Sequence, residues 1–343
     1  MGAFDFVKIF RVNKSISIDL GTANILIYDK QRKKIVLNEP SVVARDRKTG
    51  RLIAVGREAR EMLGKTPDSI QAIKPLQYGV IADIDSTKEM ITYFIHKIYG
   101  NSLFKPEVMI CVPIEVTSVE RKALFDAVKG AKKTYIIEEG RAAIIGSGVD
   151  ISQPEGSMVI DIGGGSTDIA ILSLDEIIAS KSIRIAGNRF DEDIVKYVKR
   201  KYNLLIGDRT AEKIKKELGS ALKVQSPEIM EIKGRDLETG IPNTVEVNAN
   251  EIYEAIEDSL FQIVNSTKEV LEKCPPELAA DILDNGIVMT GGGSLIKNFI
   301  DMMEKEVGIK VFLSPNPLDS VVLGGGAAFD NKKLLRTLQM KEN

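Results

Sequence analysis

The chain has 343 residues, 43% of them hydrophobic, and its 47 Lys and Arg residues nearly balance 49 Asp and Glu residues. This length exceeds one typical domain, so we expect two lobes with full cores. A net charge of −2 argues against a nucleic-acid-binding protein. Cys111 and Cys274 lack metal or redox spacing, and no apolar run reaches the roughly 18 residues that span a bilayer. These features are typical of a reduced, cytoplasmic protein.

Predicted strands and helices alternate along the chain, which indicates an α/β fold. The first half contains, in order, a hairpin at 15–28, a small insertion at 38–75, a helix at 87–99, a strand at 107–113, a helix at 117–130, a strand at 134–137 and a small-residue-rich helix at 139–148. The second half contains a hairpin at 158–172, a helix-rich insertion at about 183–245, a helix at 249–273 and a strand at 286–289.

Two of these hairpins share one pattern, in which a strand ends in Asp and a turn rich in Gly and Thr follows. Asp19 precedes the first turn and Asp161 the second. Glycine lets the backbone approach a phosphate closely, and successive N–H groups form an anion-binding concavity. Thr22, Ser166 and Thr167 add hydroxyl donors. Because bare carboxylates would repel phosphate, the pattern implies Mg²⁺ between them. Either hairpin alone could be an ordinary tight turn, but the repeat, with a third glycine loop at 290–294, predicts an ATP clamp.

Two other features are not expected to take part in nucleotide binding or catalysis. Gly64-Lys65-Thr66 looks like the end of a Walker phosphate loop, but Ala59 stands where the first glycine is required. We interpret this segment as a surface turn. His96 is the only histidine, and its place on a predicted helix indicates a structural role, so histidine acid/base catalysis is not expected.

Several ordered stretches resemble the actin/Hsp70/sugar-kinase ATPase superfamily and, within it, the MreB family of bacterial actin homologues. The stretches are 18–24, 38–44, 59–64, 184–187, 207–212 and 290–296, and the resemblance covers about 14–330. It implies an actin-like fold of two lobes, each with a duplicated RNase H-like core and a small inserted subdomain, with the nucleotide in the interlobe cleft. The implied divisions are an N-terminal segment at 1–13, lobe I at 14–145 with an insertion at about 34–76, lobe II at 146–314 with an insertion at about 181–245, and a segment at 315–343 that returns to lobe I.

The resemblance also assigns roles to residues. The implied phosphate-binding residues are Gly21, Thr22, Ala23, Asn24, Gly163, Gly164, Gly165, Ser166 and Thr167. The implied adenosine-binding residues are Glu212, Lys215, Lys216, Gly291, Gly292, Gly293 and Ser294. Glu212, Lys215 and Lys216 share one helical face, and without the resemblance they would be read as a solvated charged face. Asp19 and Asp161 are implied to bind Mg²⁺ through water.

Hydrolysis needs a group that orients the attacking water, and the resemblance gives this role to Glu139, supported by Thr167. The chain departs from the family directly afterwards, because Gly140-Arg141 stands where Pro-Met is usual. Glycine is expected to loosen the start of this helix, and Arg141 is expected to add charge near the γ-phosphate. The rate of hydrolysis is therefore left open, although activity is expected.

Two apolar segments indicate membrane contact. Within residues 2–11, Ala3, Phe6, Val7 and Phe10 share one helical face, Phe4 widens it, and basic residues accompany it. Leu103 and Phe104 form an apolar pair at an expected loop tip. The alternatives are that the first segment packs on its own lobe or is disordered, and that the pair fills the local core.

These features together favour an MreB-type ATPase. The resemblance implies that it hydrolyses ATP slowly, polymerises into antiparallel double filaments on the anionic inner surface of the cell membrane and helps determine cell shape. Other MreB paralogues and membrane morphogenesis proteins are further candidate partners, and nucleic acid is not. The alternatives are a small-molecule kinase on the same fold, a chaperone, or an ATP-binding scaffold with little hydrolysis. Fold alone cannot choose among them.

Overall fold

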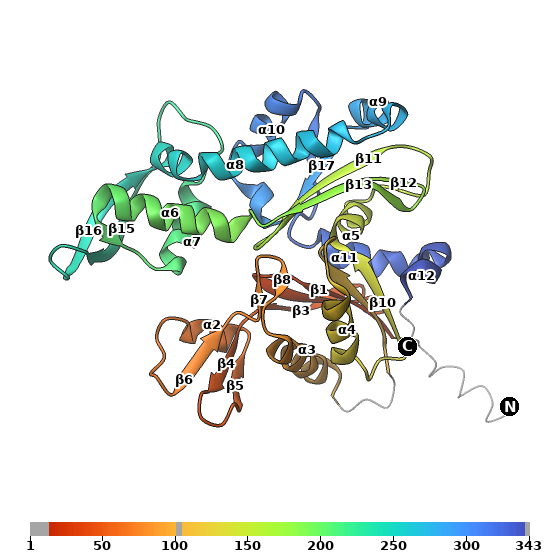
Figure 1. The fold of residues 1–343 in the computed structure, drawn as a ribbon, viewed down its shortest axis with the longest axis horizontal. Helices are drawn as coiled ribbons and strands as arrows, with labels where there is room; N and C mark the ends of the chain where they lie inside the picture. The colour runs from red at the N-terminus through yellow and green to blue at the C-terminus, as the bar shows by residue number, and fades with distance from the viewer. Residues whose placement is uncertain (1–13, 101–104, 340–343) are drawn as a thin grey trace. The chain divides into compact units, whose positions relative to one another are not determined.

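A computed structural model describes residues 14–100 and 105–339. The contacts divide the chain into two compact units (Figure 1). The first comprises residues up to Val112, Val116–Glu138 and the chain from Val321, and the second comprises Pro113–Glu115 and Glu139–Ser320. Both segments predicted to contact the membrane lie outside the described residues. The first is the N-terminal segment with Phe4, Phe6, Val7 and Phe10, and the second contains Leu103 and Phe104.

The first unit is built on a five-stranded sheet with the order β10-β9-β1-β2-β3. Its strands are β1 (Ser15–Leu20), β2 (Asn24–Asp29), β3 (Lys34–Pro40), β9 (Glu107–Val112) and β10 (Lys133–Glu138). Strand β1 pairs with β2 antiparallel and with β9 parallel. Alternate residues of β1, Ile16 and Ile18, share a buried cluster with Met90 and Phe94 of α3 (Ile84–Tyr99). Asp19 therefore points to the opposite face of the sheet.

That opposite face of the first sheet receives the C-terminal part of the chain. In α11 (Ser320–Ala327), a Cβ added at Gly325 would lie 2.2 Å from Oγ of Ser17, and one at Gly326 would lie 2.5 Å from Cδ1 of Tyr28. Only glycine permits this close helix–sheet approach. Helix α12 (Lys332–Leu338) then packs against β10.

The remaining elements of the first unit are smaller. Helix α4 (Ser118–Ala127) begins at a capping box formed by Thr117 and Glu120. A three-stranded sheet, β5-β4-β6, forms the insertion with α2 (Arg57–Met62), and a short hairpin joins β7 (Leu76–Gln77) to β8 (Val80–Ile81). The strands of the insertion are β4 (Val43–Asp46), β5 (Leu52–Val55) and β6 (Ile70–Ile73). A turn at residues 63–65 agrees with the turn predicted at 64–66.

The second unit repeats the sheet of the first. Its order is β13-β12-β11-β17-β18, with antiparallel pairs β11–β12 and β12–β13 and parallel pairs β11–β17 and β17–β18. The bounds are β11 (Ser157–Ile162), β12 (Thr167–Ser173), β13 (Glu176–Ile183), β17 (Ile287–Thr290) and β18 (Val311–Leu313). Strands β1, β2, β3, β9 and β10 correspond in order and direction to β11, β12, β13, β17 and β18. The predicted duplicated α/β core is confirmed.

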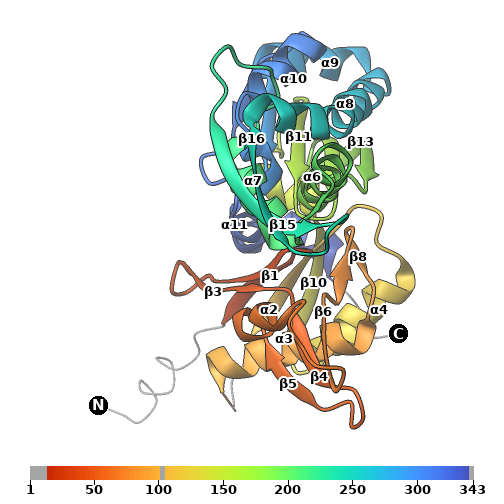
Figure 2. The same ribbon diagram turned by 90° about the vertical axis from the view of Figure 1, so that its left-hand side faces the viewer.

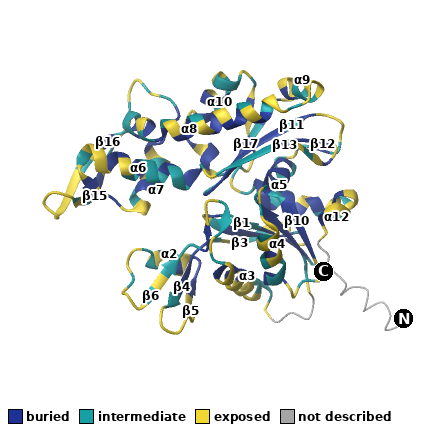
Figure 3. Ribbon diagram, in the orientation of Figure 1, coloured by how far each residue is buried: buried dark blue, intermediate teal, exposed yellow. Residues whose placement is uncertain are grey.

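Helices cover this second sheet, and its central strands are buried (Figure 3). Helix α8 (Ala249–Glu272) packs against β12, β13 and α6 (Gly187–Tyr202) (Figure 2). The insertion contains α6, α7 (Asp208–Leu218) and a sheet formed by β14 (Leu204–Leu205), β15 (Ile229–Asp236) and β16 (Pro242–Asn248). The remaining helices are α9 (Pro276–Asn285), η1 (Gly292–Leu295), α10 (Phe299–Val307) and, in the first unit, η2 (Ala328–Asp330).

Helix α5 (Glu139–Gly146) belongs to the second unit, whereas the sequence analysis placed residues 139–145 in lobe I. The physical reason is packing, because α5 lies on β11 and β12. A Cβ at Gly140 would lie 3.2 Å from Cβ of Ala170, so the glycine allows a close contact. Gly140 therefore has a packing role, and its loosening of the helix start stays a prediction. Throughout residues 14–100 and 105–339, no helix combines the length and apolar character needed to cross a membrane.

Candidate functional site

The first glycine turn lies between β1 and β2, at the end of β1 that carries Asp19. Ser41 holds this turn from behind, because its hydroxyl donates to the carbonyl of Gly21 at 2.7 Å and its N–H donates to the carbonyl of Ala23 at 3.0 Å. The hydroxyl of Thr22 accepts a hydrogen bond from the N–H of Gly79 at 3.1 Å. With these carbonyl oxygens occupied by the scaffold, the groups that the turn can offer to an anion are its N–H donors.

The second glycine loop uses the same arrangement between β11 and β12. The N–H of Gly187 donates to the carbonyl of Gly163 at 3.1 Å, and the N–H of Asn188 donates to that of Gly164 at 2.8 Å. The N–H of Gly163 donates to the carbonyl of Ser166 at 2.9 Å, which closes the loop on itself. The carbonyls of Gly163, Gly164 and Ser166 are thus occupied by backbone donors, and the groups that the loop can offer to an anion are its remaining N–H donors.

The loop also explains how α6 begins. The first N–H groups of a helix lack partners inside the helix, and no side chain caps α6 at Ala186. The carbonyls of the glycine loop supply these partners through Gly187 and Asn188. The two segments are close, because a Cβ at Gly187 would lie in van der Waals contact, 3.4 Å from the carbonyl oxygen of Gly163. The helix and the loop therefore fix each other.

The third glycine loop lies beside the second, because Thr290 pairs with Asp161 across β17 and β11. Gly291 has a φ of +82°, and a Cβ there would lie 2.3 Å from the carbonyl oxygen of Ile162 and 2.6 Å from Oδ1 of Asp161. A Cβ at Gly293 would lie 2.3 Å from Cγ2 of Ile162. Side chains at these positions would collide with the end of β11. The loop is therefore packed directly against the strand end that carries Asp161.

The three predicted adenosine-binding residues of α7 lie in different surroundings, one largely buried and two at the surface. Lys215 is largely buried, and its Nζ lies 2.7 Å from the carbonyl oxygen of Gly187 and 2.8 Å from Oδ1 of Asp191. Glu212 and Lys216 instead form an ion pair of 2.7 Å with each other on the helix surface. Lys215 thus braces the start of α6 behind the second loop, while the other two residues remain available at the surface.

Ser294 and Thr167 are both buried, and both hydroxyls are used by the fold. Oγ of Ser294 donates to the carbonyl of Gly291 at 2.6 Å, and Oγ1 of Thr167 donates to the carbonyl of Ile185 at 2.6 Å. Each oxygen keeps lone pairs that can accept a hydrogen bond. Thr167 can therefore accept a hydrogen bond from a water, whereas its own hydrogen is donated to the carbonyl of Ile185.

Glu139, the predicted water-orienting residue, is the first residue of α5 and is 8% exposed. Arg141 follows on the same helix, and its guanidinium lies 3.5 Å from the carboxylate of Glu176, at the turn that joins β12 to β13. Thr167 begins β12 and Ser173, which pairs with Glu176, ends it, so the guanidinium is drawn toward the opposite strand end. This position beside Glu176 argues against the expectation that Arg141 adds charge near the γ-phosphate.

Asp168 is a buried carboxylate that the sequence analysis did not single out. It is 1% exposed and pairs with Asp161 across β11 and β12. Oδ1 accepts a hydrogen bond from the N–H of Ile114 at 3.3 Å, while Oδ2 has no hydrogen-bond partner among the described residues. Burial raises the pKa of Asp168 to about 6, and the Ile114 N–H and the hydroxyls of Ser182 and Ser166 offset part of this effect.

These features fit a nucleotide and its metal. The glycine loops offer donors without side chains, and the buried, unpartnered oxygen of Asp168 beside Asp161 provides negative charge that a cation can offset. In the described part of the chain, no group of three or more His, Cys, Asp or Glu side chains could hold a metal ion by itself. Mg²⁺ would therefore depend on phosphate oxygens and water in addition to aspartates.

Comparison with known proteins identifies the family. The family described as MreB/Mbl protein matches residues 13–337. The chain belongs to the MreB/Mbl family. Among curated relatives, the cell shape-determining protein Mbl of Bacillus subtilis (strain 168) is 48% identical over 321 residues, covering 93% of this chain and 96% of that protein. The cell shape-determining protein MreB of Escherichia coli (strain K12) is 47% identical over 326 residues, covering 93% and 94%.

Solved structures agree with this assignment. MreB5 of Spiroplasma citri bound to ADP matches with a TM-score of 0.88 and 38% identity, covering 95% of this chain and 98% of that one, and MreB5 bound to AMPPNP matches equally well. The MamK double helical filament matches with a TM-score of 0.79 at 21% identity and shows the fold alone. The predicted resemblance to MreB and the actin-like fold are confirmed.

Within this MreB/Mbl family chain, the site residues that sequence reasoning missed are the ones that hold the loops from behind. They are Ser41, Gly79, Asp168, Gly187, Asn188 and Asp191. The signals in the sequence were the family-like stretches 38–44, which contains Ser41, and 184–187, which ends at Gly187. The other residues act through backbone groups or single carboxylates, and neither forms a pattern along the chain.

Proposed function

We propose that this MreB/Mbl family member binds ATP with Mg²⁺, hydrolyses it slowly and assembles into membrane-associated filaments that help determine cell shape. The observation that carries the proposal is the second glycine loop, in which the carbonyls of Gly163 and Gly164 accept from Gly187 and Asn188, so that N–H donors other than that of Gly163 can face phosphate. The names of the relatives, and the ADP and AMPPNP bound to MreB5, support the same function.

Each group in the site has a proposed part. Mg²⁺, held by Asp19 and Asp161 through water, would neutralise phosphate charge. Glu139 would orient the attacking water, and the hydroxyl oxygen of Thr167 would accept a hydrogen bond from that water. Glu212, Lys216 and the loop at 291–294 would contact the adenosine. Because phosphoryl transfer depends on positioning and electrostatics, the rigid support of both loops is what this chain contributes.

The filaments are proposed to be antiparallel and double, and to lie on the inner face of the cell membrane. Residues 2–11 and the pair Leu103 and Phe104 would insert into the lipid interface. Other MreB paralogues and membrane morphogenesis proteins are proposed as additional partners. Nucleotide binding would favour one shape of the protein only through its differential affinity for that shape.

Sedimentation with ATP, ADP or no nucleotide, with released phosphate assayed in the same tubes, tests this function. We expect pelleting that follows the nucleotide and slow phosphate release. Glu139→Gln is expected to lower phosphate release at least tenfold while ATP-dependent pelleting persists. Glu277→Gln, an exposed residue of α9, is the matched control and should leave both unchanged.

Two outcomes would contradict parts of the proposal. Protein that stays soluble under every nucleotide, salt and magnesium condition would argue against filaments and favour the small-molecule kinase, to be followed by a screen of phosphate acceptors. Pelleting without phosphate release above the Glu139→Gln level would favour an ATP-binding scaffold.

A further inference from the structure

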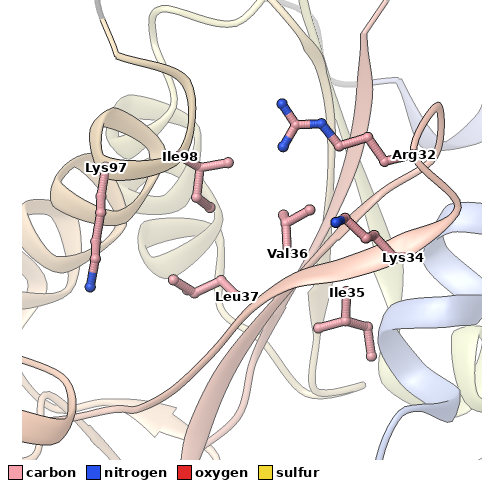
Figure 4. A pocket seen from close by; sticks show the side chains of 7 residues that line it. All are labelled: Arg32, Lys34, Ile35, Val36, Leu37, Lys97 and Ile98. Atoms are coloured by element: carbon pink, nitrogen blue, oxygen red, sulfur yellow. The ribbon is translucent and has the colours of Figure 1, made fainter.

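A hollow of about 360 Å³ lies in the first unit between β3 and the last turn of α3. Its lining consists of Arg32, Lys34, Ile35, Val36, Leu37, Lys97 and Ile98, and no acidic residue is among them (Figure 4). Val36 and Ile98 face each other across the hollow, and the charged groups of Arg32 and Lys34 lie beside Val36 (Figure 4). The hollow thus combines an apolar floor with a cationic rim.

The charges of the rim are only partly neutralised. Arg32 lies 3.5 Å from Asp29, but that buried carboxylate also accepts a hydrogen bond from the hydroxyl of Tyr99 at 3.0 Å. Lys97 lies 3.8 Å from Glu39. Lys34 forms no ion pair with any side chain in the described residues. A net positive charge therefore remains at the hollow for an anionic ligand.

The C-terminal end of α3 adds little negative charge that could repel an anion from the hollow. A helix C-terminus is negative because its last carbonyls lack partners. Here the carbonyl of His96 accepts a hydrogen bond from the N–H of Gly100 at 2.7 Å, which satisfies one of them. In addition, Nζ of Lys14 lies 5.3 Å and Cζ of Arg32 lies 5.9 Å from the centre of the Tyr99 ring, so cations collect around this helix end.

The place of the hollow in the sheet indicates what approaches it. The turn between β2 and β3 lies at the end of the sheet where β1 and β9 begin, because Ile16 pairs with Asp29 and Ser15 pairs with Glu107. Strand β1 follows the N-terminal segment 1–13, and β9 follows residues 101–104. Both segments proposed for lipid contact therefore join the fold at the sheet end that carries the hollow.

We propose that this hollow binds the phosphate of an anionic phospholipid headgroup. The proposal rests on the proposed membrane association and names its lipid class. Arg32 would hold the phosphate through its guanidinium fork and Lys34 through its charge, while Val36 and Ile98 contact the glycerol and the first methylenes of the chains. An apolar floor suits a lipid better than a fully hydrated anion, which has no surface to place there.

The first test compares two variants that remove equal charge. Arg32→Gln/Lys34→Gln removes the rim, and Lys48→Gln/Lys65→Gln removes two exposed lysines of the insertion as a matched control. Partitioning is measured on vesicles of phosphatidylcholine alone and with about 30% phosphatidylglycerol. On the anionic vesicles, we expect the rim variant to bind about tenfold more weakly and the control to change less than twofold. Equal losses of vesicle binding in both variants would show that only the total charge of the protein matters and would overturn the proposal.

A second measurement separates the hollow from membrane binding as such. The methyl NMR signals of Val36 and Ile98 are followed while short-chain dihexanoyl-phosphatidylglycerol or inorganic phosphate is added to the full chain. We expect shifts with the lipid, much weaker shifts with phosphate, and loss of the lipid shifts in Lys34→Gln, a variant that breaks no described ion pair. Equal shifts with phosphate would assign the site to free phosphate and overturn the lipid proposal.

The two measurements together keep the proposals distinguishable. Methyl shifts without any vesicle binding would retain the headgroup site and overturn the membrane function. Vesicle binding without methyl shifts would retain the membrane function and overturn the headgroup site.

Discussion

The backbone N–H of Ile114 donates a hydrogen bond of 3.3 Å to Oδ1 of Asp168, and this contact joins residues 113–115 to β12 of the second unit. The carboxylate that accepts it is buried, and its second oxygen is without a partner in the described structure. Burying an unpaired charge is costly, so the native protein without nucleotide holds the proton of Asp168 more tightly than the unfolded chain does.

The first prediction concerns pH. Because burial raises the pKa of Asp168 from 3.8 to about 6, its favourable contribution is complete below about pH 4 and is lost as the pH rises through 6. At about 1.4 kcal/mol per pKa unit, the loss is on the order of 3 kcal/mol. Asp168→Asn should be more stable than the natural chain at pH 8 and show no such loss. Urea unfolding midpoints of the nucleotide-free protein at pH 5 and 8 measure the part of this loss that remains above pH 5, which is about half of the total.

Asp258→Asn, on the exposed side of α8, serves as the control for this prediction and should leave the pH dependence unchanged. A parallel pH dependence in the natural chain and in Asp168→Asn would show that the carboxylate is already ionised at pH 5.

The second prediction separates two adjacent lysines of α7. Lys215→Gln removes a largely buried cation from Asp191 and from the carbonyl of Gly187, so we expect a loss of about 2 kcal/mol and weaker nucleotide binding. Lys216→Gln removes an exposed partner of Glu212 and should cost less than about 0.5 kcal/mol. Thermal unfolding and ADP titration measure both variants. Equal destabilisation by the two would contradict the bracing role of Lys215.

The third prediction concerns the third glycine loop. Gly291→Ala introduces a Cβ at a φ of +82°, within 2.3 Å of the carbonyl of Ile162, so the loop must move and nucleotide affinity should fall at least tenfold. Gly308→Ala is the matched control, because Gly308 also has a positive φ, +73°, but its Cβ would meet no atom within 4 Å. Isothermal titration with ADP and Mg²⁺ measures the affinities. Unchanged affinity in Gly291→Ala would place the nucleotide away from this loop.

The fourth prediction concerns the departure from the family at Gly140-Arg141. Arg141→Met removes a buried guanidinium whose described partner is Glu176, at the turn between β12 and β13. We expect a loss of about 1–2 kcal/mol in stability and less than a twofold change in phosphate release, because the charge lies away from the loop that precedes Thr167. Unfolding midpoints and a phosphate assay at saturating ATP test this. A large change in phosphate release without a loss of stability would contradict this prediction and support a role for Arg141 near the γ-phosphate.

Several features were determined by the sequence itself. Short apolar runs that flank a glycine turn in the Asp19 and Asp161 hairpins predict the central strands of both sheets, because strand-forming runs and tight turns are local properties. The glycines at 163–165 and 291–293 likewise mark phosphate-type loops, since close approach and positive φ require glycine. The predicted α/β class and the MreB resemblance followed from these local patterns and are confirmed.

Only the tertiary structure decided what supports those loops. Ser41, Gly187 and Asp191 reach them from other elements, and nothing in their local sequence marks a partner that lies far along the chain. The same reason explains Arg141, whose direction depends on Glu176 across the fold. Local patterns determine which residues form strands and turns, whereas burial and long-range hydrogen bonds determine which of their polar groups remain free to meet a ligand.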